Sequence, residues 1–141
     1  MKKVLKNTLL LVVMLMAVVL LAGCVGNKIV ATKTTDDYSG KYEEKLEAKL
    51  KDDKVSEVKI TYEYEDEESA TFMHDIFESI VSIAGEENVE EFKNFQLSQD
   101  GKIVVVIMDG AAFMKLEGAE ESEMTKEGFK ALLEEQDYIV K

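Results

Sequence analysis

Residues 57–64 read EVKITYEY, and in this stretch large apolar or aromatic residues alternate strictly with polar ones. Strict alternation predicts a half-buried β-strand. The preceding run, Tyr42–Leu50, also alternates except at Glu44, and the polar sequence Asp52-Asp53-Lys54 separates the two runs. Two alternating runs joined by a short polar turn predict a β-hairpin. A helix is the alternative for the first run, because its large apolar residues also recur every four positions.

An amphipathic helix is predicted directly after this hairpin. Apolar residues recur every three or four positions from Ala70 to Ala84, Ser69 is a suitable N-cap and Gly85 is a natural stop. The acidic residues 65–68 precede the first turn, where the positive end of the helix dipole favours negative charge.

A second hairpin is predicted between residues 95 and 108. Asp100-Gly101 is a strong two-residue turn signal, and it lies between Phe95–Leu97 and the apolar run Ile103–Met108. Because the second run is apolar at every position, we expect it inside the sheet, with a helix on one face and a further cover on the other.

Two short helices and a closing strand complete the predicted fold. Each helix has a capping residue and an apolar stripe: one begins at Asp109, runs through Leu116 and ends at Gly118, and one begins at Thr125 and carries Phe129, Leu132 and Leu133. A strand is expected over Tyr138–Val140. The order of elements predicts an α+β fold, in which helices pack on an antiparallel sheet of two hairpins plus a short C-terminal strand.

The N-terminal segment has the features of an export signal. Lys2, Lys3 and Lys6 form a basic start, residues 8–22 carry no charge, and Leu21-Ala22-Gly23-Cys24 closes the segment with the only cysteine of the chain. This ending resembles the lipobox of bacterial lipoproteins. The resemblance implies that signal peptidase II cuts before Cys24 and that the Cys24 sulfur carries a diacylglycerol. A retained membrane helix is the alternative. Such a helix needs roughly 17–25 residues, and the segment has 15 residues from Thr8 to Ala22 or 18 from Thr8 to Val25, so it is barely long enough.

The chain is therefore expected to have three parts. Residues 1–23 are interpreted as a lipoprotein signal peptide, 24–40 as a lipid-anchored polar tether and 41–141 as a single α+β domain. Residues 27–40 are mostly polar, and as a flexible coil they would hold the domain roughly 20 Å from the membrane. The remaining residues have the usual length of one domain with its own core.

The chain combines four features: the lipobox Cys24, the polar tether, the strand residues Ile60-Thr61-Tyr62 and the helix–strand unit from Gly128-Phe129 to Val140. In these features it resembles the small YehR-type lipoproteins. The resemblance implies a membrane-anchored α+β domain. It implies no activity, because that group is largely of unknown function, and it assigns no functional residue.

The charge of the chain limits its partners. The formal net charge is -12 over 141 residues, and loss of the three lysines of the signal peptide makes it -15. This net negative charge opposes binding to nucleic acid, which is itself negatively charged. All basic residues are lysine, so the side chain best suited to bidentate recognition of carboxylate or phosphate is absent from the sequence.

The sequence shows no catalytic constellation. His74 is the only histidine, and its neighbour Asp75 is expected to point in another direction, so we interpret His74 as a surface residue and predict no metal site and no cofactor. The serines lack nucleophile-elbow glycines. Adjacent acid pairs are abundant, so pairing alone identifies no catalytic carboxylate; they include Asp52-Asp53, Glu86-Glu87, Glu90-Glu91, Glu120-Glu121 and Glu134-Glu135.

The function expected from the sequence is that of a lipoprotein anchored by Cys24 on the extracytoplasmic face of the cell membrane, acting as a binding or interaction module for a protein or small ligand. The alternatives are an exported hydrolase that uses unidentified carboxylates and an accessory subunit of an envelope complex. An enzyme needs a concave pocket with converging carboxylates, at least one of them desolvated. An interaction module needs an exposed apolar or aromatic surface.

Overall fold

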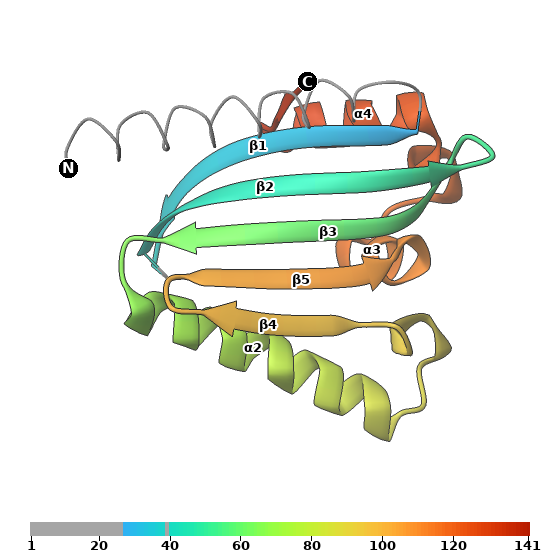
Figure 1. Ribbon diagram of the computed structural model, residues 1–141. Helices are drawn as coiled ribbons and strands as arrows, with labels where there is room; N and C mark the ends of the chain where they lie inside the picture. Colours follow the sequence, from blue (N-terminus) through green and yellow to red (C-terminus); the bar gives the residue numbers. More distant parts are fainter. Residues whose placement is uncertain (1–26, 39) are drawn as a thin grey trace, which may run out of the picture.

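The computed structural model describes residues 27–38 and 40–141 (Figure 1), so the predicted signal peptide and Cys24 lie outside the described residues. The described strands form one antiparallel sheet in the order β4-β5-β3-β2-β1-β6. Helices pack on this sheet, which confirms the predicted α+β class. The elements are β1 (Lys28–Asp37), β2 (Gly40–Lys51), β3 (Lys54–Tyr64), α2 (Glu67–Glu86), the 3-10 helix η1 (Glu90–Phe92), β4 (Gln96–Asp100), β5 (Ile103–Asp109), α3 (Gly110–Glu117), the 3-10 helix η2 (Glu121–Met124), α4 (Lys126–Glu135) and β6 (Ile139–Val140).

Both predicted hairpins are present. Asp52 and Asp53 join β2 to β3 with φ angles of 53° and 62°, and positive φ at both central residues is typical of the tight turns that join twisted strands. The first alternating run is therefore a strand, and its helical alternative is wrong. In the second hairpin the turn residues are Gly101 and Lys102, one position later than predicted, with Gly101 at a φ of 58°.

Most of the segment predicted as a polar tether, residues 24–40, forms strand β1 instead. Residues 28–37 pair with β2 over the whole strand, from Lys28 opposite Lys49 to Asp37 opposite Gly40. The reason is physical: Ile29-Val30-Ala31 buries its side chains, and the threonines that follow favour extended backbone. The sheet domain therefore begins at about residue 28, and the sheet has six strands among the described residues instead of the five expected.

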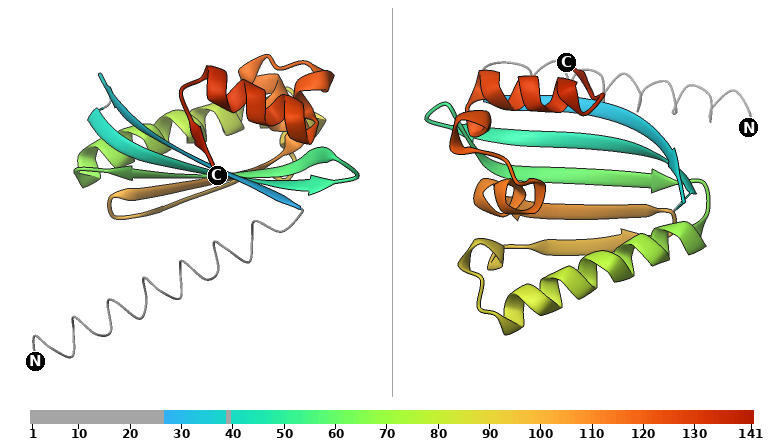
Figure 2. Two further views of the ribbon diagram at one scale, coloured as in Figure 1. Left: turned by 90° about the horizontal axis from the view of Figure 1, so that it is seen from above. Right: turned by 180° about the vertical axis from the view of Figure 1, so that it is seen from behind.

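The helices all lie on one face of the sheet (Figure 2). Helix α2 packs against β3, β4 and β5, while α4 packs against β1, β3 and β6. The opposite face is covered by no element that the structure describes, which corrects the expectation that β5 is covered on both sides. Ile103, Val105 and Ile107 of β5 accordingly stay partly exposed.

The ends of α2 differ from the prediction. Its N-cap is Asp66, whose carboxylate accepts a hydrogen bond of 2.7 Å from the backbone N–H of Ser69, the residue predicted as the cap. The helix also continues past Gly85 to Glu86. Asp66 can cap the helix because an aspartate carboxylate at this position reaches the free N–H groups of the first helical turn.

The shorter helices largely follow the prediction. Gly118 ends α3 in the left-handed conformation with a φ of 65°, and the Thr125 hydroxyl at the start of α4 accepts a hydrogen bond from the N–H of Gly128. Asp109 occupies the N-cap position of α3 but makes no capping hydrogen bond; its carboxylate accepts one from the Asn94 side chain at 2.8 Å.

Replacing Gly110 with alanine is expected to lower the free energy of unfolding by about 1–3 kcal/mol, the usual cost of overpacking. A Cβ atom at Gly110 would lie 2.1 Å from the carbonyl oxygen of Val55, and a backbone atom of β3 cannot move aside cheaply. Gly85→Ala is the matched control, because nothing lies within 4 Å of its Cβ position. Urea denaturation should show the control to be as stable as the wild type or more so. Equal stability of the two variants would contradict the close contact between Gly110 and the backbone of Val55.

Candidate functional site

A cleft of about 740 Å³ lies between helix α2 and strand β4. Its volume is within the range of small-molecule sites. Apolar and polar groups both contribute to its wall: His74, Glu78, Ser79, Val81, Ser82 and Ile83 from α2, with Phe95 and Leu97 from the β4 side. This combination of an apolar surface with a few polar groups is what a small-ligand site needs.

The course of α2 explains this cleft. Near its beginning the helix is tied to the sheet, because the Gln99 side chain of β4 donates a hydrogen bond of 2.9 Å to the Thr71 hydroxyl. From there α2 runs obliquely across the end of the sheet, and its C-terminal half diverges from β4 (Figure 2). The apolar stripe predicted from the sequence contributes Met73 and Phe77 to the core, while Val81 of the same stripe and polar residues beside it line the cleft.

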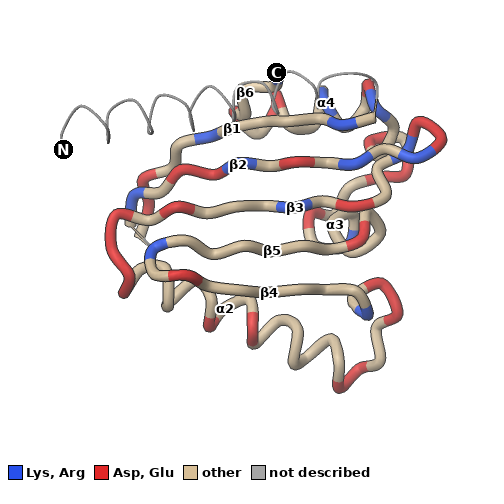
Figure 3. The backbone as a smooth tube through the Cα atoms, viewed as in Figure 1, with Lys and Arg blue, Asp and Glu red and all other residues tan. Residues whose placement is uncertain are grey.

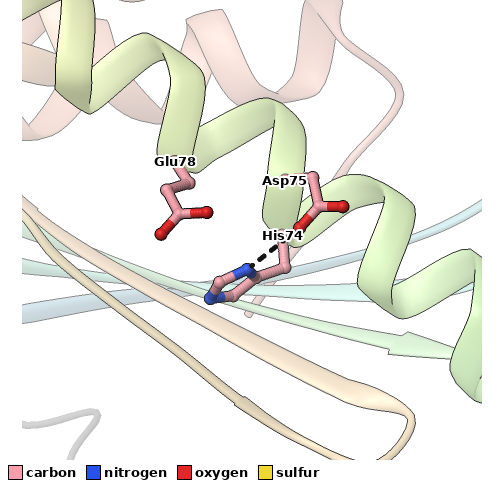
Figure 4. A group of neighbouring side chains, drawn as sticks. All are labelled: His74, Asp75 and Glu78. Carbon is pink, nitrogen blue, oxygen red and sulfur yellow. Dashed lines mark ion pairs between the residues drawn. The ribbon is translucent and has the colours of Figure 1, made fainter.

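Three potential metal ligands converge at this edge of α2 (Figure 4). One ligand atom from each of His74, Asp75 and Glu78 lies within 4.8 Å of the other two. Nδ1 of His74 is 3.7 Å from Oδ1 of Asp75, and the two side chains are 25% and 68% exposed. The arrangement corrects the expectation that His74 and Asp75 diverge: the aspartate side chain reaches back to the imidazole although the two residues are adjacent on the helix.

A second cluster of polar groups lies on the helix-covered face of the sheet. Lys33, Glu44 and Tyr62 are neighbours in register across β1, β2 and β3. Tyr138, which follows α4, adds its ring, and the Lys33 Nζ lies 5.3 Å from the ring centroid. The hydroxyl groups of Tyr138 and Tyr62 are hydrogen-bond partners of the Glu44 carboxylate. These contacts connect the C-terminal segment to the middle of the sheet.

Burial governs the ionisation of this cluster. It raises the pKa of the Glu44 carboxyl, although hydrogen bonds from Tyr138 and Tyr62 and the charge of Lys33 oppose the shift. Burial, with the nearby charge of Glu44, also raises the pKa values of the Tyr62 and Tyr138 hydroxyls. Both tyrosines therefore stay protonated and can donate to Glu44, so we interpret the cluster as a stabilising network.

Glu44→Gln is expected to become more stable relative to the wild type as the pH rises. Because the folded-state pKa of Glu44 lies above the ordinary 4.5, the folded protein binds more protons than the unfolded chain, and its stability falls through the window that begins near pH 4.5. Glutamine keeps an acceptor for the tyrosines but cannot ionise. Thermal denaturation of both proteins at about pH 4 and about pH 8 tests this, and a stability difference that stays constant with pH would contradict it.

The open face of the sheet carries a third group of charges. Lysine and acidic residues alternate along β2 and β3 (Figure 3). Glu47 lies among three lysines, with the Lys28 Nζ at 2.9 Å, Lys45 at 3.8 Å and Lys59 at 4.0 Å. Partial burial opposes ionisation of Glu47, but the Lys28 hydrogen bond and the three positive charges outweigh it and lower its pKa. The three lysines share the single carboxylate of Glu47, and we assign no ligand site to them.

The other residues considered from the sequence lie apart from the cleft or outside the described residues. Cys24 is among the undescribed residues. The adjacent acid pairs lie at turns, in 3-10 segments and at helix ends, where most are exposed. Ser79 and Ser82 do line the cleft, but the Ser79 hydroxyl donates to the backbone oxygen of Asp75. Sequence reasoning missed the cleft itself, since it depends on the angle between α2 and β4.

Comparisons of the chain with protein-family models, with curated proteins and with solved structures found no match.

Proposed function

We propose that this protein is a lipoprotein held on the extracytoplasmic face of the cell membrane by a diacylglycerol on Cys24, and that it binds a small ligand or a segment of a partner in the α2–β4 cleft. The lipobox-like ending of the N-terminal segment supports the anchor. Among the described residues, no helix is long and apolar enough to span a bilayer.

The cleft is the observation that carries the binding function. It has the volume of a ligand site, Phe95 and Leu97 give it apolar surface, and His74 and Glu78 give it polar groups that can orient a ligand. Ile83 of the cleft wall is 57% exposed, and Phe72 is a further exposed apolar residue on the same helix. Apolar side chains exposed beside a cleft favour a binding partner.

Strand β1 changes how such an anchor would hold the domain. Lys28, the first residue of the sheet, is only four positions after Cys24. Even a fully extended chain spans at most about 3.6 Å per residue, so the start of β1 would lie within roughly 15 Å of the lipidated cysteine. The anchored domain would therefore rest beside the headgroups, with the β2–β3 turn and the start of β1 nearest to the membrane.

The exported hydrolase is the weaker candidate. Glu44 supplies the partly desolvated carboxyl that such an enzyme needs, and the charge of Glu117 acts on it. However, tyrosine hydroxyls bind the Glu44 carboxylate, and Glu44 lines a smaller pocket of about 380 Å³ along β1, β2 and β3, not the α2–β4 cleft. The geometry therefore favours binding over hydrolysis.

Filling the cleft is expected to remove ligand binding. Ser82→Trp places a large ring among the cleft-lining side chains, whereas Ser98→Trp adds the same ring on β4 outside the cleft-lining set. A library of small aromatic and carboxylate compounds can be screened by ligand-observed NMR. Compounds that bind the wild type and Ser98→Trp but not Ser82→Trp would support the proposal. No binder, or equal binding to both variants, would count against it.

A further inference from the structure

We propose that His74, Asp75 and Glu78 bind a divalent transition-metal ion, with Zn²⁺ as the reference ion, at the edge of the α2–β4 cleft (Figure 4). The inference deepens the proposed function, because His74 and Glu78 belong to the same cleft. It does not depend on the lipid anchor.

The geometry brings the ligands together on little more than one turn of helix. His74 and Glu78 are four positions apart, so their side chains lie one above the other on the same side of α2. Asp75 adds a carboxylate whose Oδ1 is 3.7 Å from Nδ1 of His74. The helix backbone therefore holds all three Cα atoms in place before an ion arrives, which reduces the entropy that binding must overcome.

The distances require only a small adjustment. With metal–ligand bonds of about 2.0–2.1 Å, ligand atoms around a tetrahedral zinc ion lie roughly 3.3 Å apart. The three groups are within 4.8 Å of one another. Asp75 and Glu78 are exposed, so rotation about their side-chain bonds can close the remaining distance without disturbing the core.

The donor set selects the class of ion. An imidazole nitrogen beside two carboxylates suits Zn²⁺ and similar transition metals, whereas Mg²⁺ and Ca²⁺ prefer oxygen ligands alone. Three protein ligands leave a fourth position open. Because His74 and Glu78 line the cleft, this position can be filled by water or by a donor group of a ligand bound there. We infer that the preferred ligands carry a metal-binding group such as a carboxylate.

A simple ion pair between His74 and Asp75 would also bring these two side chains together. That alternative involves two groups and predicts no role for Glu78. A metal site needs all three, so the contribution of Glu78 distinguishes the two explanations.

The single histidine of the chain makes the test direct, because His74 gives the only imidazole signals of the protein in NMR spectra. The full-length protein, labelled at histidine and held in detergent, would be titrated with ZnCl₂ and separately with MgCl₂. We expect a saturable change of the His74 ring signals with Zn²⁺, reversal by a chelator, and a much weaker response to Mg²⁺.

Substitutions locate the other ligands. Asp75→Asn and Glu78→Gln should each weaken Zn²⁺ binding by at least about tenfold, because even the loss of a group that only hydrogen-bonds to a metal ligand costs about 10–100-fold in affinity. Glu86→Gln is the matched control, since it removes the same charge from the same helix away from the three ligands. Amide spectra of each variant would confirm that the fold is retained.

Three results would overturn the proposal. These are a His74 signal that does not respond saturably to Zn²⁺, binding by Glu78→Gln equal to that of Glu86→Gln, and an equal response to Mg²⁺. None of them would affect the comparison of Ser82→Trp with Ser98→Trp, so failure of the metal site can be told from failure of the cleft as a ligand site.

Discussion

Replacing Phe129 with alanine is expected to lower the free energy of unfolding by about 3–5 kcal/mol. The Phe129 side chain is 0% exposed, and its ring meets that of Phe113 edge to face with 5.3 Å between the centroids. The substitution therefore removes apolar contact and leaves a cavity between α3, α4 and the sheet. Domains of ordinary size are stable by only about 5–15 kcal/mol, so much of the total stability would be lost.

Phe72→Ala is the matched control for this prediction. It deletes the same side chain from another helix, but Phe72 is 49% exposed, so less apolar surface returns to water and no closed cavity forms. Urea denaturation followed by circular dichroism gives the midpoint for each variant. A midpoint for Phe129→Ala that matches that of Phe72→Ala would mean that the α3–α4 layer contributes little to stability.

Much of this fold could be predicted because local pattern and tertiary burial agree. The alternating residues of β3 place Val58, Ile60 and Tyr62 on the helix-covered face, and these positions are buried. The three-and-four spacing in α2 places Met73 and Phe77 against the core, although Phe72 of the same stripe is 49% exposed. Where a periodic pattern gives a helix or strand one apolar face, and that face packs on the core, the sequence alone predicts both the type of element and its orientation.

Strand β1 could not be predicted in the same way. Between Thr32 and Asp37 its residues are threonine, lysine and aspartate, which give no apolar alternation. Its ordering depends on hydrogen bonds to β2, a tight connection at Gly40 with a φ of 106°, and the pair of bridges to β6 from the far end of the chain. These are tertiary contacts, and composition alone therefore pointed to a coil.

The candidate sites show a similar division. The break at Glu44 in the alternation of β2 is a sequence signal for a buried polar group, but its partner Tyr138 is distant in the chain and could not be inferred. In the His74 cluster, the one-turn separation of His74 and Glu78 was readable from the sequence. The contribution of Asp75 depends on its side-chain rotamer, and the cleft depends on helix orientation, so neither is encoded in residue spacing.

Cys24→Ala is expected to remove the protein from the membrane fraction of a bacterial cell. Without the cysteine sulfur there is no atom to carry the diacylglycerol, and two acyl chains are what separates durable anchoring from marginal binding. The net negative charge of the chain opposes binding to an anionic membrane surface, so charge does not replace the lipid. The wild-type protein should have the intact mass of residues 24–141 plus the lipid, and the variant should lack that lipid mass.

Val25→Ala is the matched control, since it alters the neighbouring residue and keeps the sulfur; it should fractionate and weigh as a lipidated chain. The decisive contrary result is a wild-type protein of full mass without lipid that stays in the membrane together with Cys24→Ala. The uncharged run of residues 8–22 would then be a retained membrane helix. Because β1 begins four positions after Cys24, either form of attachment would hold the sheet close to the bilayer. The mass of the protein, and not the position of the domain, therefore distinguishes a lipid anchor from a retained helix.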